Sequence, residues 1–173
     1  MRLYLIGMPG AGKTTLGRGL ATFYKVPFYD LDEEIVRREG RSIPAIFGKE
    51  GEAYFREVEA ATLREVVNKH AKLVLATGGG TPCFHQNIDV LLGTGLTLYL
   101  AVPVEELVRR LQRAATSRPL LAQLPDAQAL EARLRETLGV REQFYDRAPL
   151  RCAAAACSVE NVQRLIAHYR TTG

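Results

Sequence analysis

Short apolar runs alternate along the chain with longer segments in which an apolar position recurs every three or four residues. The apolar runs predict five buried strands, at residues 3–6, 26–30, 73–76, 96–102 and 152–159. The longer segments predict helices at residues 13–24, 31–39, 52–69, 85–92, 104–113, 126–145 and 161–170, with one extra turn at 42–47. Strands that alternate with helices in this way predict an α/β fold, in which helices cover both faces of a five-stranded parallel sheet.

The chain is expected to form a single domain over residues 1–173. This length is close to that of an average domain. The sequence contains no internal repeat, no low-complexity tract and no linker long enough to divide domains. One stretch stands apart, because residues 114–125 contain two prolines and have weak helical periodicity. We expect a mobile lid there, at about residues 112–125.

The 23 basic and 19 acidic residues give a net charge of +4, and the two signs are interspersed along the chain. Because no basic stripe stands out, the charge fits a small anionic ligand better than a nucleic acid. No stretch approaches the length of about 18 apolar residues that a membrane span needs, and the apolar run at residues 3–6 is too short for a signal peptide. We therefore expect a cytoplasmic protein. Nothing in the apolar pattern requires a partner, so we expect a monomer.

The cysteines and histidines predict no stabilising cross-link. Cys83, Cys152 and Cys157 are odd in number and form no C-x-x-C pair. They are expected to be buried or inert thiols rather than a disulfide framework. The three histidines lie far apart in the sequence, so a structural zinc site is not expected either.

Residues 7–14 match the whole of the phosphate-loop pattern G-x-x-x-x-G-K-[ST]. A predicted strand precedes the loop and a predicted helix follows it, which is the context that the motif requires. The backbone N–H groups of such a loop and the positive end of the helix attract phosphate oxygens. Lys13 is predicted to bind the β and γ phosphates, and the Thr14 hydroxyl to ligate Mg²⁺. The motif predicts a nucleotide but does not identify the acceptor.

Two carboxylates follow the second predicted strand. Asp30 and Asp32 lie at its carboxyl end, the edge at which open α/β sheets bind ligands. One of them can hold hydrated Mg²⁺ while the other accepts a proton from an attacking hydroxyl. The alternative is a structural role, in which both residues cap the next helix and interact with its dipole.

Two further features point to the same edge of the sheet. Gly78, Gly79 and Gly80 follow the third predicted strand, and without side chains they let the backbone approach a ligand closely. Arg118 lies in the expected lid, where an arginine can close over a phosphate that is being transferred. The alternatives are a flexible turn for the glycines and a solvated surface position for Arg118. The chain is small and lacks a complete N-K-x-D segment, so these features favour a kinase of small metabolites over a signalling GTPase.

Taken together, these segments resemble the shikimate kinase family. The resemblance extends from Arg2 to about Tyr145 and depends on the order and spacing of several motifs, at residues 7–18, 29–32, 40–47, 51–59, 78–80 and 118–121. It implies a P-loop kinase fold and Mg²⁺-dependent transfer of a phosphoryl group from ATP to the 3-hydroxyl of shikimate, a step of aromatic amino-acid (chorismate) biosynthesis. The substrates implied are ATP and shikimate, and the cofactor is Mg²⁺.

The resemblance also implies roles for individual residues. Catalysis is expected from Lys13, Asp32 and Arg118. ATP is expected to contact Gly10, Ala11, Gly12, Lys13, Thr14, Thr15, Arg110 and Arg118. Shikimate is expected to contact Asp32, Arg56, Gly78, Gly79, Gly80 and Arg141, with Phe47 and Phe55 as an apolar wall. Mg²⁺ is expected at Thr14 and, through water, at Asp30.

Three alternatives remain open at this point. The segment from Arg141 to Tyr145 lacks a proline that is frequent in the family, and Arg147 follows closely, so either arginine can be the one that binds the substrate carboxylate. A surface ion pair with Glu52 or Glu59 is the structural alternative for Arg56. For the whole chain, the alternatives are a gluconate or nucleoside-monophosphate kinase of the same fold and a regulatory module that binds ATP with little phosphoryl transfer.

Overall fold

The computed structural model describes residues 1–116, 126–153 and 156–172. Five parallel strands form one sheet in the order β2-β3-β1-β4-β5. Their bounds are Arg2–Ile6 for β1, Phe28–Asp30 for β2, Leu73–Ala76 for β3, Leu96–Ala101 for β4 and Leu150–Ala153 for β5. The central strands β1 and β3 are almost entirely buried, as expected for a parallel sheet with helices on both faces. The predicted α/β fold with a five-stranded parallel sheet is confirmed.

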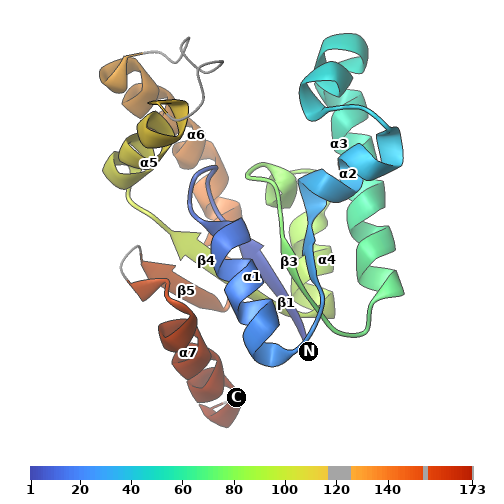
Figure 1. Cartoon of the computed structure of the whole chain (residues 1–173), viewed down its shortest axis with the longest axis vertical. Coiled ribbons are helices and arrows are strands. Elements are labelled where there is room, and N and C mark those ends of the chain that lie inside the picture. Colours follow the sequence, from blue (N-terminus) through green and yellow to red (C-terminus); the bar gives the residue numbers. More distant parts are fainter. Residues whose placement is uncertain (117–125, 154–155, 173) are drawn as a thin grey trace.

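Seven helices connect and cover the strands in the described part of the chain. They are α1 (Lys13–Tyr24), α2 (Leu31–Glu39), α3 (Ile43–Lys69), α4 (Asn87–Thr94), α5 (Val104–Thr116), α6 (Ala127–Tyr145) and α7 (Val159–Thr172), with a short 3₁₀ turn, η1, at Thr81–Cys83. Figure 1 shows α1 and α7 in front of the sheet and α4 behind it. The pair α2 and α3 lies beyond one side of the sheet, and the pair α5 and α6 beyond the other. No described helix has the length and apolar character of a membrane span.

The α3 segment contains a break that the sequence pattern anticipates. Gly51 has φ 82° and ψ 176°, a conformation outside the helical region, and it separates the turn that starts at Ile43 from the long helix that ends at Lys69. Ser42 caps the first part, because its hydroxyl accepts a hydrogen bond from the Ala45 N–H at 3.3 Å. Helical pieces are thus present where they were expected, at 42–47 and 52–69, but the first one continues to Glu50 instead of ending after one turn.

The fifth strand corrects one prediction. It was expected at residues 152–159 but spans Leu150–Ala153. The ladder with β4 explains this position, because Leu98 pairs with Leu150 and the last β4 residue, Ala101, pairs with Ala153. The described β4–β5 pairing ends at Ala153, and α7 begins at Val159.

The cysteines correct another prediction, because Cys152 and Cys157 form a disulfide. Their Cα atoms lie 5.4 Å apart, within the range that a disulfide spans. An odd cysteine count without a C-x-x-C pair does not reveal such a local closure. Cys83 is the free cysteine.

The expected lid lies largely outside the described residues. Helix α5 continues to Thr116, three residues past its predicted end at Arg113. Residues 117–125, including Arg118, are not described, so the lid and the role of Arg118 remain predictions.

Candidate active site

The phosphate loop connects β1 to α1, as predicted, and lies between the α2–α3 and α5–α6 pairs in Figure 1. All three of its glycines, Gly7, Gly10 and Gly12, have a positive φ that favours glycine. Gly7 has φ 141°, and a Cβ there would lie 2.8 Å from the Leu100 carbonyl oxygen. Gly12 has φ 93° and precedes the first turn of α1. The strand, turn and helix thus place the open N-terminus of α1 at the loop, where backbone N–H groups attract phosphate.

Lys13 is buried within the loop, with 8% of its surface exposed. Its Nζ donates hydrogen bonds to the carbonyl oxygens of Gly7 at 2.8 Å and Met8 at 2.9 Å. Burial lowers the pKa of Lys13 to about 8, and the nearby carboxylates of Asp32 and Asp30 oppose that decrease. The ammonium group is therefore held by the loop itself, close to the two carboxylates that follow β2.

Asp30 links the phosphate loop to α2. Its Oδ2 accepts a hydrogen bond from the Thr14 hydroxyl at 2.7 Å, and its Oδ1 accepts one from the Asp32 N–H at 3.0 Å. The second bond makes Asp30 the N-cap of α2, so the structural alternative is realised for this residue. The first bond places a hydroxyl beside a carboxylate at the helix N-terminus. Oxygen donors of this kind are the ligands that Mg²⁺ prefers, so the residues present fit the expected metal.

A cavity of about 420 Å³ lies over the loop. It is lined by Pro9, Gly10, Gly12, Lys13, Thr14, Thr15, Asp30, Asp32, Thr77, Gly78 and Gly79. The cavity brings together the phosphate loop, both predicted carboxylates and two of the three glycines after β3. We call it the phosphate cavity.

A smaller cavity of about 180 Å³ adjoins it. It is lined by Pro9, Asp32, Ile43, Phe55, Arg56, Glu59, Gly78, Gly79, Gly80 and Arg141. The two cavities share Pro9, Asp32, Gly78 and Gly79. This second cavity, which we call the acceptor cavity, contains all six residues predicted to contact shikimate.

Asp32 has an unusual electrostatic environment. Burial raises the pKa of its carboxyl to about 6, and the nearby Asp30 and Glu59 carboxylates add to this increase. Lys13 and Arg56 act in the opposite direction. A carboxyl with a pKa near neutrality can both accept and release a proton in this pH range.

Arg56 reaches the acceptor cavity from α3 and is almost fully buried. Its guanidinium donates to Glu59 at 2.9 Å and to Glu52 at 3.2 Å, and lies 4.1 Å from the centre of the Phe84 ring. Glu59 is only 1% exposed and accepts a second hydrogen bond, from the Thr81 hydroxyl at 2.6 Å. The ion pairs expected as the alternative for Arg56 are thus formed, but the pair with Glu59 is buried and lines the cavity. The sequence indicates the Arg56–Glu59 spacing but not this burial.

Arg141 and Arg147 differ in position. Arg141, on α6, lines the acceptor cavity and is partly buried. Arg147 pairs with Asp89 at 2.6 Å, and its side chain is 45% exposed. Of the two candidates, Arg141 is the one next to Arg56 and the glycines.

The glycines after β3 permit the two arginines to approach the backbone. A Cβ on Gly79 would lie 2.9 Å from Arg141 Nη1 and 2.7 Å from the Pro9 ring. A Cβ on Gly80 would lie 2.6 Å from Arg56 Nη2. A side chain at Gly79 would clash with the Pro9 ring, and one at Gly80 would displace the Arg56 guanidinium from its present position.

Phe55 and Phe47 lie near the acceptor cavity. Phe55 lines it, and the Phe47 ring is 4.6 Å from the Phe55 ring, centre to centre. Phe47 is 38% exposed, so it forms an outer apolar surface rather than part of the lining.

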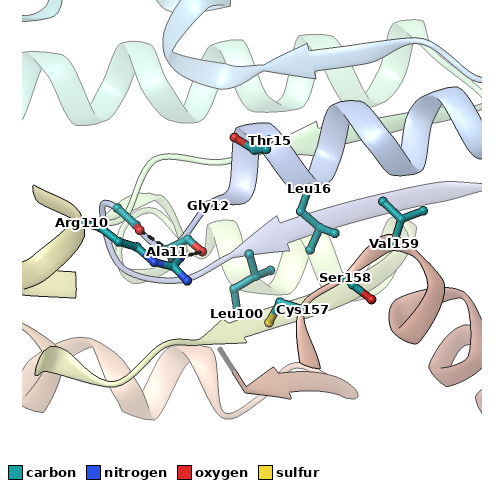
Figure 2. Close-up of a pocket in the computed structure, with 10 residues that line it drawn as sticks. Ala11, Gly12, Thr15, Leu16, Leu100, Arg110, Cys157, Ser158 and Val159 are labelled. Carbon is teal, nitrogen blue, oxygen red and sulfur yellow. Dashed lines mark hydrogen bonds between the residues drawn. The ribbon is translucent and has the colours of Figure 1, made fainter. Parts of the chain in front are cut away.

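A third cavity, of about 470 Å³, lies on the other side of the phosphate loop and is drawn in Figure 2. Its lining consists of Gly10, Ala11, Gly12, Thr15, Leu16, Leu100, Arg110, Cys157, Ser158 and Val159. Arg110 donates to the Ala11 carbonyl at 3.0 Å and to Glu106 at 2.9 Å. The sequence motifs do not indicate Leu100 or residues 157–159. Their only signal is position, since they lie at or just beyond the carboxyl ends of β4 and β5, the edge where such sheets bind ligands.

The parallel sheet, the phosphate loop after β1 and the carboxylates after β2 define a nucleotide-dependent phosphotransferase of the P-loop kinase class. The family model for shikimate kinase matches residues 9–169. The chain is 40% identical over 149 residues to the shikimate kinase of Parabacteroides distasonis, and the alignment covers 86% of this chain and 85% of that relative. It is 34% identical over 166 residues to the shikimate kinase of Aquifex aeolicus, and the alignment covers 96% of this chain and 94% of that relative.

Solved structures give the same result. The crystal structure of shikimate kinase from Bacteroides thetaiotaomicron superposes with a TM-score of 0.86 at 35% identity, over 98% of both chains. The shikimate kinase of Acinetobacter baumannii, in complex with shikimate, superposes with a TM-score of 0.83 at 38% identity, over 97% of this chain and 93% of the other. The chain belongs to the shikimate kinase family. Membership confirms the predicted enzyme class, an ATP-dependent kinase that phosphorylates shikimate in aromatic amino-acid biosynthesis.

Proposed function

We propose that Asp32 carries the transfer of the ATP γ-phosphoryl group to the 3-hydroxyl of shikimate. The supporting observation is its place between the two cavities. Among the residues they share, Asp32 is the one with a titratable side chain. A hydroxyl group of the acceptor therefore meets the phosphate cavity at this carboxylate.

In this proposal Asp32 accepts the hydroxyl proton as the oxygen attacks the γ-phosphorus, and the bond from that phosphorus to the β–γ bridging oxygen breaks to release ADP. Its carboxyl has a pKa of about 6, so it is ionised at and above neutral pH. A carboxylate of this basicity can accept a proton from the attacking hydroxyl. Phosphoryl transfer needs little covalent chemistry from the protein, so positioning and charge neutralisation provide the larger part of the acceleration.

The acceptor is held by opposite charge. Shikimate has one carboxylate and three hydroxyl groups, and Arg56 and Arg141 supply planar guanidinium groups that fit a carboxylate. Gly78, Gly79 and Gly80 offer backbone groups on the same side of the cavity. The exposed Arg147, already paired with Asp89, lies outside this set.

ATP occupies the phosphate loop, with its phosphates on the N–H groups of Gly10, Ala11, Gly12, Lys13, Thr14 and Thr15. Lys13 leaves its loop carbonyls, or shares them, to neutralise charge on the transferring phosphate. Arg110 lies along the third cavity, beside the nucleotide. Arg118, which lies outside the described part of the chain, is also assigned to the phosphates in this proposal.

Mg²⁺ fits beside Thr14 and Asp30, whose hydroxyl and carboxylate oxygens are 2.7 Å apart. The Thr14 hydroxyl would hold the metal directly, and Asp30 would hold it through water. When bound, the metal neutralises charge on the β and γ phosphates. Asp30 would keep its cap on α2 through Oδ1 while the metal is bound. We also propose that the chain acts as a monomer in the cytoplasm.

The test is ADP release from MgATP on purified protein, with shikimate, gluconate, AMP or no acceptor. We expect release that depends on shikimate, and NMR of the product should place the phosphate on the 3-hydroxyl. A Lys13→Met variant is the matched control for contaminating kinases. Release with a different acceptor would contradict the proposed acceptor cavity. Nucleotide binding without release for any acceptor would instead favour a regulatory module.

A further inference from the structure

Tyr145 ends α6 beneath the acceptor cavity and is completely buried. Its hydroxyl donates a hydrogen bond to the Gly79 carbonyl oxygen at 2.6 Å, and lies 3.8 Å from Met8 Sδ in the phosphate loop. Its ring lies 5.0 Å from the ring of Tyr99 on β4, centre to centre. Arg141 is one helical turn earlier on α6. Tyr145 thus contacts the phosphate loop and the glycine segment without lining either cavity itself.

The hydrogen bond to Gly79 constrains a peptide that would otherwise rotate easily. Three successive glycines have no Cβ atoms to limit their backbone angles. A peptide unit is planar and trans, so its C=O and N–H point in opposite directions. Fixing the Gly79 carbonyl on Tyr145 therefore also fixes the direction of the Gly80 N–H.

The Gly80 N–H is free to bind a ligand. Among the described residues, no group accepts a hydrogen bond from it. Gly80 lines the acceptor cavity and lies against the Arg56 guanidinium. An unpaired backbone donor at such a site is available for an oxygen atom of the acceptor.

The hydroxyl of Tyr145 is not needed for packing. The ring packs against the Tyr99 ring, and a phenylalanine ring would do the same. Burial raises the pKa of the Tyr145 hydroxyl, and the Arg141 guanidinium partly offsets this increase. The group therefore stays protonated and remains a donor at physiological pH.

We propose that Tyr145 is a positioning residue for the acceptor: its hydroxyl locks the peptide between Gly79 and Gly80 so that the Gly80 N–H faces the acceptor cavity. This inference rests on the proposed function, in which the glycine segment contacts shikimate. It assigns a role to the position four residues after Arg141, on the same face of α6.

The test is a Tyr145→Phe variant, with Tyr99→Phe as the matched control. Tyr99 is equally aromatic and buried, and it contacts the same ring but not Gly79. We expect Tyr145→Phe to raise the KM for shikimate about fivefold to tenfold, the effect of losing one hydrogen bond, with the KM for ATP changed less than about twofold. Tyr99→Phe should leave both constants unchanged.

Two outcomes would overturn the inference. One is a wild-type KM for shikimate in Tyr145→Phe. The other is an equal rise in both KM values together with a lower Tm, which marks a purely structural role. Both are assessed only against a wild-type enzyme that phosphorylates shikimate, so a failure of the proposed function is recognised separately. If Tyr145→Phe does not fold, wild-type protein labelled with ¹⁵N-glycine serves instead. Shikimate must then shift the Gly80 amide resonance, and an unmoved resonance contradicts the inference.

Discussion

The two halves of the active site are built in different ways. The phosphate loop is a run of eight consecutive residues, and its groups for phosphate are backbone N–H groups and one lysine. The acceptor cavity instead draws its polar side chains from α2, α3 and α6, with the glycine segment after β3 between them. A phosphate group can be bound by local backbone geometry, whereas a carboxylate and several hydroxyl groups need side chains from several elements.

The two halves also hold charge differently. Lys13 rests on two neutral carbonyl groups in the loop. In the acceptor cavity, Arg56 is paired with the buried Glu59, which is itself held by Thr81. A buried ion pair contributes little net stability, because desolvation offsets the attraction, but removing one partner leaves a costly unpaired charge. In the acceptor half, the Arg56–Glu59 pair therefore orients the guanidinium group but adds little to the free energy of unfolding.

Asp32 connects the two halves, and its replacement should have the largest effect. Asp32→Asn keeps the shape of the side chain but removes the proton acceptor, so we expect kcat to fall by about 10²–10⁴-fold with ATP affinity nearly unchanged. ADP-release kinetics and ATP titration measure the two quantities. Glu33→Gln, an exposed neighbour on α2 that pairs with Arg18, is the matched control. A variant with normal turnover and weakened ATP binding would assign Asp32 to the nucleotide half instead.

The same residue predicts a pH dependence of activity and stability. Because the folded-state pKa of Asp32 is raised from 3.8 to about 6, the carboxylate is lost as the pH falls through 6. We expect an acid limb near pH 6 in kcat/KM for shikimate.

The free energy of unfolding has the opposite pH dependence. A raised carboxyl pKa in Asp32 favours the folded state at low pH, and this contribution is lost as the pH rises through 6. Asp32→Asn should therefore raise Tm by about 2–4 °C at pH 8, and by less at pH 5. An equal gain at both pH values would contradict this.

The next largest effect separates the two arginines on the acceptor side. Arg141→Ala removes a guanidinium from the cavity lining, so we expect the KM for shikimate to rise about 10–100-fold with little change in the KM for ATP. Arg147→Ala removes an exposed pair with Asp89 and should leave both constants within about twofold of wild type. Steady-state kinetics of the two variants, side by side, distinguish the candidates. A large effect in Arg147→Ala and none in Arg141→Ala would reverse the assignment.

The contrast between the halves also explains what the sequence could predict. The strand, the phosphate loop and the helix are adjacent in the sequence. Their pattern alone therefore predicts where Lys13, Thr14 and the loop glycines lie. Asp30 and Asp32 were found because the carboxyl ends of parallel strands meet at one edge. Arg56 and Arg141 are predicted at the site only through the family resemblance. Whether their side chains meet in one cavity depends on how α3 and α6 pack, which the sequence pattern does not show.

Other features had no local signal at all. Tyr145 reaches Gly79, 66 residues earlier in the chain, and the pattern around it predicts only the end of a helix. The lining at residues 157–159 depends on where β5 stops, and β5 stops where its ladder with β4 ends. The sequence does not predict the Cys152–Cys157 disulfide for the same reason, because Cys152 lies on β5 and Cys157 lies beyond its end.

The disulfide gives the smallest expected effect on activity, and it tests whether the halves are independent. Cys157 lines the third cavity, drawn in Figure 2, but among the described residues it makes no polar contact toward that cavity. The acceptor cavity lies on the other side of the phosphate loop. A cross-link that closes so short a loop stabilises by about 2 kcal/mol, so Cys152→Ser should lower Tm by about 4–8 °C. We expect the KM for ATP to rise by no more than about threefold and the KM for shikimate to stay at its wild-type value. Dithiothreitol should reproduce these changes in the wild type and add nothing in Cys152→Ser, which is the matched control. A larger change in the KM for shikimate than in that for ATP would mean that the two halves are coupled through β4 and β5, and the separation argued from their construction would be wrong.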